Sequence, residues 1–319
     1  MSTDYDIAIV GGGLVGTSLA LALDQQGWRV ALLERAPFRD TAPPTFDDRT
    51  LALSQASQNI LDGIGLWSAL ERDRTAIRQV HVSQPGAPGV VNLVAEDYGL
   101  EALGHVVQAR GIGREVKAAL PQLKQVSLLV PAQVTAIETA ESAVTVSYDH
   151  DGETRQLTCR LLIGADGTRS VVRRGLGLEA RVHDYEQTAV IANVMPGVDH
   201  QGRAFERLTP SGPLAVLPHV ERRVGIVWVA GTQEAEAVLA LDDEAFLAGL
   251  QQRFGYRLGE LTRPGERASY PITQLALDHP VAQRAVVIGN AAHTLHPVAA
   301  QGFHLGLRDV ATLAHLLAR

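Results

Sequence analysis

The sequence predicts an α/β protein in which a Rossmann-like nucleotide-binding domain is interrupted by a second domain built on a mixed β-sheet. Three observations support this prediction. An apolar strand, a glycine-rich turn and a helix open the chain, and similar strand-to-turn motifs recur at residues 161–178 and 286–310. Between these two motifs, residues 178–280 contain three apolar stretches of strand length. A single nucleotide domain that returns to its sheet after long insertions accounts for this spacing.

The composition is that of an ordinary globular protein, with 46% hydrophobic and 20% charged residues among 319. A net charge of −7 argues against general nucleic-acid binding. The single cysteine, Cys159, leaves no partner for an intramolecular disulfide, and its apolar neighbours predict a buried thiol. No apolar run approaches the roughly 20 residues of a membrane span, and the N-terminus lacks a signal-peptide pattern, so we expect a cytoplasmic protein.

The first motif, residues 4–35, places G-x-G-x-x-G between a strand and a helix. Gly11 permits the tight turn, Gly13 lets a pyrophosphate approach the backbone, and Gly16 lets the helix pack on the strand. Glu34 ends the second predicted strand, 18 residues after Gly16, where its carboxylate can accept hydrogen bonds from a ribose. The motif predicts dinucleotide binding but does not by itself distinguish FAD from NAD.

The remainder of the chain gives further evidence on this choice. Residues 36–67 form a proline-rich loop and then a predicted helix with Leu51, Ile60, Leu61 and Ile64 on its apolar side, whereas an NAD dehydrogenase usually continues its wound sheet here. Residues 134–166 alternate between apolar and polar side chains and predict a β-meander.

The predicted strands and turns also set the expected domain limits. We assign residues 1–77, 99–177 and 282–319 to the nucleotide domain. Residues 78–98 and 178–281 form the predicted substrate domain, which includes an acidic helix at 242–254.

Together these motifs resemble the class A flavoprotein aromatic hydroxylases, in particular their ubiquinone-biosynthesis branch and the 2-polyprenyl-6-methoxyphenol hydroxylases within it. Beyond the first motif, the matching stretches are DDRTLAL, AEDYGLEALGHVV, IGADGTRS, YEQTAVIANV, GRAFERLTPSGPLAVLP and GNAAHTLHPVAAQGFHLGLRDV. They extend along nearly the whole chain. The resemblance implies that the nucleotide domain is an FAD-binding domain of the glutathione-reductase type. Such proteins usually continue with several more helices after the last motif, and these are absent from this sequence.

The resemblance also implies a set of site residues. The implied cofactor-binding residues are Gly11, Gly13, Leu14, Val15, Gly16, Glu34, Arg35, Arg49, Gln108, Arg110, Asp166, Gly289, Asn290, Gly302, Phe303 and His304. The implied catalytic residues are His296, Pro297 and Arg223. No metal site is expected, because His293 and His296 lack the third and fourth ligands that such a site needs.

The motif at residues 289–310 differs from most of the family at one position. The family usually has an aspartate after the glycine, which accepts hydrogen bonds from the ribityl hydroxyls, and this chain has Asn290. An amide still accepts through its carbonyl oxygen, at a loss of about 1 kcal/mol. At His304, where the family often has asparagine, two interpretations remain open: the side chain bonds the flavin ring, or it points away.

The implied activity is hydroxylation of 2-polyprenyl-6-methoxyphenol to the benzoquinol, through a flavin C4a-hydroperoxide formed with O2. NAD(P)H or another electron donor would reduce the flavin. The expected partners are the polyprenylated phenol and a ubiquinone-biosynthesis multiprotein complex, with peripheral contact at the inner face of the membrane and no nucleic acid. The alternatives are a monooxygenase acting on another aromatic substrate, a flavin-bound assembly subunit without activity and, from the first 35 residues alone, an NAD dehydrogenase.

Overall fold

The computed structural model describes residues 3–38, 50–296 and 301–318. Its first large sheet has the strand order β18-β19-β11-β1-β2-β8, and β10 and β9 extend from β11. The strands of this sheet are β1 (Tyr5–Val10), β2 (Val30–Leu33), β8 (Val126–Leu129), β9 (Gln133–Thr139), β10 (Val144–His150), β11 (Glu153–Gly164), β18 (Val281–Ala282) and β19 (Ala285–Val287). The four pairings that join β19, β11, β1, β2 and β8 are parallel.

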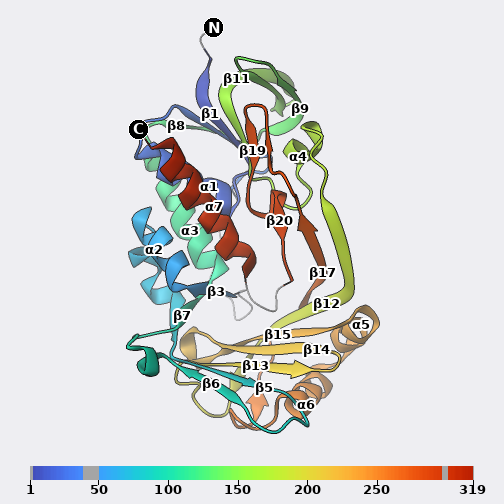
Figure 1. Ribbon diagram of the computed structural model, residues 1–319. Helices are drawn as coiled ribbons and strands as arrows, with labels where there is room; N and C mark the ends of the chain where they lie inside the picture. Colours follow the sequence, from blue (N-terminus) through green and yellow to red (C-terminus); the bar gives the residue numbers. More distant parts are fainter. Residues whose placement is uncertain (1–2, 39–49, 297–300, 319) are drawn as a thin grey trace.

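The central parallel strands β1 and β2 are buried on both faces over residues 7–10 and 30–33, which explains their unbroken apolar sequence there. Ile7 and Ile9 of β1 pack among helices, whereas Ala8 and Val10 pack against the antiparallel meander of β9, β10 and β11. The helices on the first face lie side by side in Figure 1. They are α1 (Leu14–Asp24), α2 (Gln55–Gly63), α3 (Ala109–Ala119) and α7 (Gln301–Leu317). A parallel sheet between helices and a meander confirms the glutathione-reductase-type domain.

A small three-stranded sheet, in the order β3-β7-β4, follows the first part of this domain. Its strands are β3 (Thr50–Ser54), β7 (Gly104–Gln108) and β4 (Arg74–Ile77). The prediction that Leu51 belongs to a helix was wrong, because Leu51 pairs with Val107 of β7. The helix begins only at Gln55, and the Ser54 hydroxyl caps it by accepting from the Ser57 amide.

The second large sheet forms the other half of the molecule and appears in the lower part of Figure 1. Its order is β20-β17-β12-β15-β14-β13-β5-β6, with β16 beside β12. The strands are β5 (Gln79–Ser83), β6 (Val91–Val94), β12 (Arg181–Pro196), β13 (Arg203–Thr209), β14 (Gly212–Pro218), β15 (Val224–Gly231), β16 (Leu261–Thr262), β17 (Ala268–Ala276) and β20 (His293–Thr294). The β5–β13 pairing is parallel and its neighbours are antiparallel, so the sheet is mixed, as the sequence predicted.

Side chains alternate between the two faces of this sheet. Residues such as Val190, Leu214 and Ile226 pack on one face against α5 (Thr232–Ala240) and α6 (Asp243–Phe254). Their sequence neighbours, such as Ile191 and Ala215, therefore point to the opposite face. That opposite face is available to form the wall of a site.

The short segment β20 connects the two halves. β20 pairs with β17 in the second sheet, although its residues fall in a range that the sequence assigned to the nucleotide domain. β5 and β6, from the predicted 78–98 insertion, also lie in the second sheet. The exact domain limits remain predictions. Across the described part of the chain, no helix has both the length and the hydropathy to span a membrane.

Cys159 lies in β11 opposite Tyr5 and is fully buried. Burial raises the pKa of its thiol to about 12. We therefore expect iodoacetamide to leave Cys159 unmodified in the folded protein at about pH 8, because the thiolate is the reactive form. Mass spectrometry should detect full alkylation only after denaturation in urea. Rapid alkylation of the native protein would contradict this burial.

Candidate active site

A cavity of about 700 Å³ lies between the turns of the nucleotide domain and the inner face of the second sheet. One wall consists of residues from the strand-to-helix turns and from β3. These residues are Gly13, Leu14, Val15, Thr50, Leu51, Ala52, Ala165, Gly167, Thr168, Asn290, Thr294, Leu295, Gly302 and Phe303. The opposite wall comes from the second sheet and is mainly apolar. Its residues are Ala189, Ile191, Glu206, Pro213, Ala215, Leu217, Val227, Val229, Tyr270, Pro271, Ile272 and Thr273.

The first turn joins β1 to α1, and its glycines have different surroundings. Gly11 has a φ of +111°, and a Cβ there would lie 2.5 Å from the Ala165 carbonyl oxygen. At Gly16 a Cβ would lie 2.0 Å from the Gly11 carbonyl oxygen, so the helix and the strand require glycine at both positions. A Cβ on Gly13 would meet no protein atom within 4 Å. The open space at Gly13 faces the cavity, where a phosphate could approach the N-terminus of α1.

Glu34 follows β2 and lies beside this turn. Its Oε2 accepts a hydrogen bond from the Gly12 amide at 2.6 Å, and its Oε1 accepts one from the Ala36 amide at 2.9 Å. A carboxylate has about four lone-pair sites, so these two bonds leave capacity for ribose hydroxyls. Arg35, the next residue, is exposed.

The second turn joins β11 to α4 (Val171–Gly175). Asp166 Oδ2 accepts hydrogen bonds from the Val171 and Val172 amides at 2.6 and 3.3 Å, while its Oδ1 is buried without a partner. The buried Arg173 donates to the Ala291 carbonyl at 2.9 Å and to the Thr168 carbonyl at 2.8 Å. Arg173 therefore ties the second turn to the third, a role that its place in the sequence did not reveal.

The third turn runs from β19 through η5 (Gly289–Ala291) to β20. Gly289 has a φ of +57°, and a Cβ there would lie 3.2 Å from the Val15 side chain. Asp309 of α7 accepts from the Gly289 amide at 2.8 Å, and its Oδ2 lies 2.7 Å from His293 Nε2. This carboxylate fixes the loop onto α7. Asn290 is exposed and lines the cavity.

The start of α7 contributes Gly302 and Phe303 to the cavity wall. The His304 side chain instead lies against β3, with Nε2 at 2.7 Å from the Ala52 carbonyl and 3.2 Å from the Ser54 amide. Of the two interpretations left open by the sequence, the structure therefore favours the one in which the ring points away. A cofactor contact at His304 would come from its backbone.

The implied catalytic residues His296 and Arg223 are not among the residues that line the cavity. His296 Nε2 is 3.2 Å from the Gln187 Oε1, its ring packs edge-on against Tyr185, and burial lowers its pKa. Arg223 is buried in the β14–β15 hairpin and pairs with Glu221 at 3.2 Å. The catalytic roles of both residues remain predictions.

Two of the implied cofactor-binding residues belong to the β7–α3 region. Gln108 is buried opposite Thr50, and Arg110 is in the first turn of α3. Arg49 and Pro297 lie outside the described residues. Within the described ranges, no group of three histidine, cysteine, aspartate or glutamate side chains could hold a metal ion.

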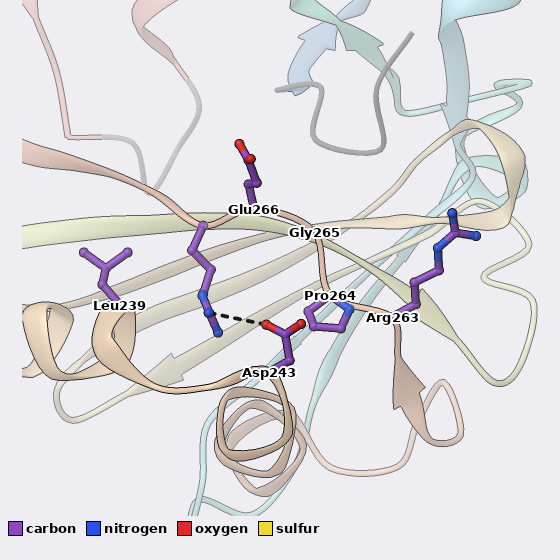
Figure 2. Close-up of a pocket in the computed structure, with 7 residues that line it drawn as sticks. Leu239, Asp243, Arg263, Pro264, Gly265 and Glu266 are labelled. Carbon is purple, nitrogen blue, oxygen red and sulfur yellow. Dashed lines mark ion pairs between the residues drawn. The ribbon is translucent and has the colours of Figure 1, made fainter.

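Another hollow, of about 590 Å³, lies on the second domain between α5, α6 and residues 263–267 (Figure 2). An Arg267–Asp243 ion pair of 3.4 Å crosses it. None of its lining residues comes from the three turns. The site therefore belongs to the larger cavity.

The larger cavity fits a flavin dinucleotide. Gly13 leaves room for the pyrophosphate at a helix N-terminus, Glu34 is held at the end of β2, and Asp166 has one buried oxygen without a partner. Asn290, Gly302 and Phe303 border the space between the turns and the sheet. The site residues implied by the sequence did not include Glu206 or Tyr270, which lie on strands of the opposite wall, although Glu206 falls within the matching stretch GRAFERLTPSGPLAVLP.

Comparisons with known proteins agree with this geometry. The family model of the FAD binding domain matches residues 4–319. Ubiquinone hydroxylase UbiL of Rhodospirillum rubrum is 38% identical over 313 residues, which cover 98% of this chain and 72% of that protein. The 3-demethoxyubiquinol 3-hydroxylase of Escherichia coli is 32% identical over 316 residues, which cover 98% and 79% of the two chains.

A solved structure has the same fold. The crystal structure of PqsL from P. aeruginosa in complex with 2-aminobenzoylacetate aligns with a TM-score of 0.83 at 22% sequence identity. The alignment covers 98% of this chain and 85% of PqsL.

Replacing Gly13 with valine should remove bound flavin while the protein still folds, because the new side chain meets no protein atom and occupies the approach to α1. We expect FAD affinity to fall at least roughly tenfold, as for the loss of a charge-assisted hydrogen bond. Fluorescence titration of the apoprotein measures this affinity. Gly63→Val, on the exposed end of α2, is the matched control. Stoichiometric flavin in purified Gly13→Val would show that this turn is not the binding site.

Asn290→Asp should bind FAD at least as tightly as the parent, because a carboxylate is the stronger acceptor for ribityl hydroxyls. Asn290→Leu removes the acceptor at similar size and should lose about 1 kcal/mol, or roughly fivefold in affinity. The same titration compares the three proteins. A tenfold loss in the aspartate variant would indicate that the Asn290 NH2 group donates to the cofactor.

Proposed function

Because the chain belongs to the FAD-binding domain family and is related to the ubiquinone hydroxylases, we propose that its substrate is a polyprenylated methoxyphenol. The protein is an FAD-dependent monooxygenase that acts on aromatic rings. The proposed reaction is hydroxylation of 2-polyprenyl-6-methoxyphenol, para to its hydroxyl group, to give the benzoquinol precursor of ubiquinone.

The observation that carries the proposal is the cavity with two unlike walls. Its volume of about 700 Å³ lies in the range of small-molecule sites. The turn wall combines backbone and polar groups, such as those of Gly13, Thr168 and Asn290, with apolar side chains, whereas the sheet wall is mainly aliphatic. This arrangement suits a polar cofactor on one side and an apolar aromatic substrate on the other.

The residues of the first wall would hold the cofactor. The turn at Gly13 and the N-terminus of α1 would bind the pyrophosphate, and Glu34 would accept from the ribose. Asn290 would accept from the ribityl chain, and the backbone of Gly302 and Phe303 would border the ring. When bound and reduced, the flavin activates O2 and supplies an electrophilic oxygen atom.

The second wall would position the substrate and exclude water. The apolar side chains of β12, β14, β15 and β17 would cover the aromatic ring, and their fixed positions would restrict its orientation. Oxygen substituents on the substrate make the carbon para to the hydroxyl electron-rich, which suits attack on an electrophilic oxygen.

A prenyl tail would dominate the affinity, since each buried CH2 group contributes about 0.8 kcal/mol. A substrate of this kind resides in a membrane, so the protein would extract it through peripheral contact or receive it within a multiprotein complex. The net charge of −7 provides no attraction to anionic lipid. This favours transfer from partner proteins over electrostatic docking.

Complementation tests the proposed substrate. We expect the full-length gene to restore ubiquinone in cells that lack the para-hydroxylating enzyme and to remove the accumulated polyprenyl methoxyphenol, both measured by mass spectrometry. The Gly13→Val variant provides the inactive control. Persistent accumulation of this phenol, with flavin-loaded protein present in the cells, would mean that the enzyme hydroxylates a different aromatic compound.

A further inference from the structure

Glu206 of β13 is the single carboxylate among the described residues that line the cavity. It belongs to the inner face of the sheet, and its neighbours across the strands are Val82 of β5 and Ala215 of β14. In the same transverse row, Ala215 lies opposite Val227, which lies opposite Ile191. An ionisable group thus stands in an otherwise aliphatic row.

No contact with the described residues stabilises the Glu206 carboxylate in this position. Its Oε1 is buried, and no hydrogen bond or ion pair joins it to the described residues. Burial alone raises the pKa of the Glu206 carboxyl to about 7. A structural glutamate in a core is normally paired, since an unpaired buried polar group destabilises the fold. An unpaired one that faces a ligand cavity indicates a partner in the ligand.

We propose that the Glu206 carboxylate accepts the hydrogen bond, and during the reaction the proton, of the substrate's phenolic hydroxyl. This assignment rests on the proposed function, because it requires a phenol in the cavity. Glu206 is suited to the role because it belongs to the substrate wall, whereas Asn290 belongs to the wall of turns. Tyr270, the other titratable lining residue described, lies four strands away on β17.

The step balances without a further reactant. The phenolic O–H bond breaks, an O–H bond forms on Glu206, and the released electron pair raises the electron density of the ring carbons ortho and para to the oxygen. The para carbon takes the electrophilic oxygen that the flavin chemistry supplies. Loss of the proton from that carbon restores the aromatic ring, and the other oxygen atom of O2 would take up this proton and leave as water. Glu206 returns its own proton to the phenolic oxygen.

The proposal sets a pH dependence with a defined sign. The accepting form is the carboxylate, so hydroxylation should rise as the pH increases through about 7. The groups that face Glu206 across the sheet, Val82 and Ala215, do not titrate. Of the titratable groups nearby, Tyr270 lines the cavity and the pKa of His296 is lowered by burial. A Glu206→Gln variant separates their contributions from that of Glu206.

The same carboxyl should make the folded protein less stable as the pH rises. The folded-state pKa lies above that of an unfolded glutamate, so stability is present at about pH 5 and decreases through pH 7 as the buried charge forms. Glu206→Gln should therefore have a higher Tm than the parent at about pH 8, and a smaller advantage at about pH 5.

The test uses FAD-loaded protein and two probes, 2-geranyl-6-methoxyphenol and its O-methyl ether, which cannot give up a proton. Flavin fluorescence measures binding. For a single turnover, the flavin is photoreduced and mixed with aerated buffer, and the product is measured by mass spectrometry. The exposed Glu236→Gln in α5 makes the same chemical change away from the cavity and is the matched control.

We expect the parent and Glu236→Gln to prefer the phenol over the ether and to hydroxylate it with a rate that rises through about pH 7. Glu206→Gln should lose the preference and the pH-dependent rise, and should hydroxylate roughly 100-fold more slowly. A Glu206→Gln protein that keeps the parent's preference and rate, or that is less stable than the parent at about pH 8, would contradict the role of Glu206. The proposed function would still stand in that case. A parent protein that neither binds nor hydroxylates the phenol would overturn the proposed function, and this assignment with it.

Discussion

Three turns pack closely together at the carboxyl ends of the neighbouring strands β1, β11 and β19, and the rest of the structure depends on this packing. Gly16 lies so near the Gly11 carbonyl, and Gly11 so near Ala165, that no side chain fits between them. Arg173 joins the second turn to the third, and Asp309 joins the third to α7. The turns therefore form one rigid wall although they come from distant parts of the chain, around Gly11, Ala165 and Gly289. Binding a cofactor to this wall would therefore require little ordering of the protein itself.

The second sheet is joined to this wall by β20, and β12 forms its long central strand. β12 is 16 residues long and pairs with β15 and β17, while β20, which directly follows the third turn, pairs with β17. Alternation along the strands then sorts the side chains. One set packs on α5 and α6, and the other forms the apolar wall. The cavity is thus a consequence of strand periodicity combined with the position of β20.

The sequence predicted those parts of the fold that local patterns determine. Residues 7–10 of β1 and all of β2 are apolar, and Gly16 is required by the Gly11 carbonyl only five residues earlier, so the first turn was predicted correctly. Leu51 was misassigned because its strand forms only by pairing with β7, more than 50 residues later. Arg173 and Asp309 were missed for a related reason, since each acts on a backbone group distant in the sequence. Glu206 could have been noticed as a charged residue flanked by alternating apolar positions, but its burial depends on how the two halves meet.

The charge distribution around the third turn explains why an amide is compatible with position 290. The carboxylate that organises this loop belongs to Asp309, which binds the Gly289 amide and His293 from the α7 side. Asn290 is exposed on the cavity side, and among the described residues no hydrogen bond joins its side chain to the rest of the loop. The loop conformation is therefore independent of the charge at position 290, which affects only the cofactor contact. On such a loop an aspartate-to-asparagine difference changes the strength of one hydrogen bond among many, and the fold of the site stays the same.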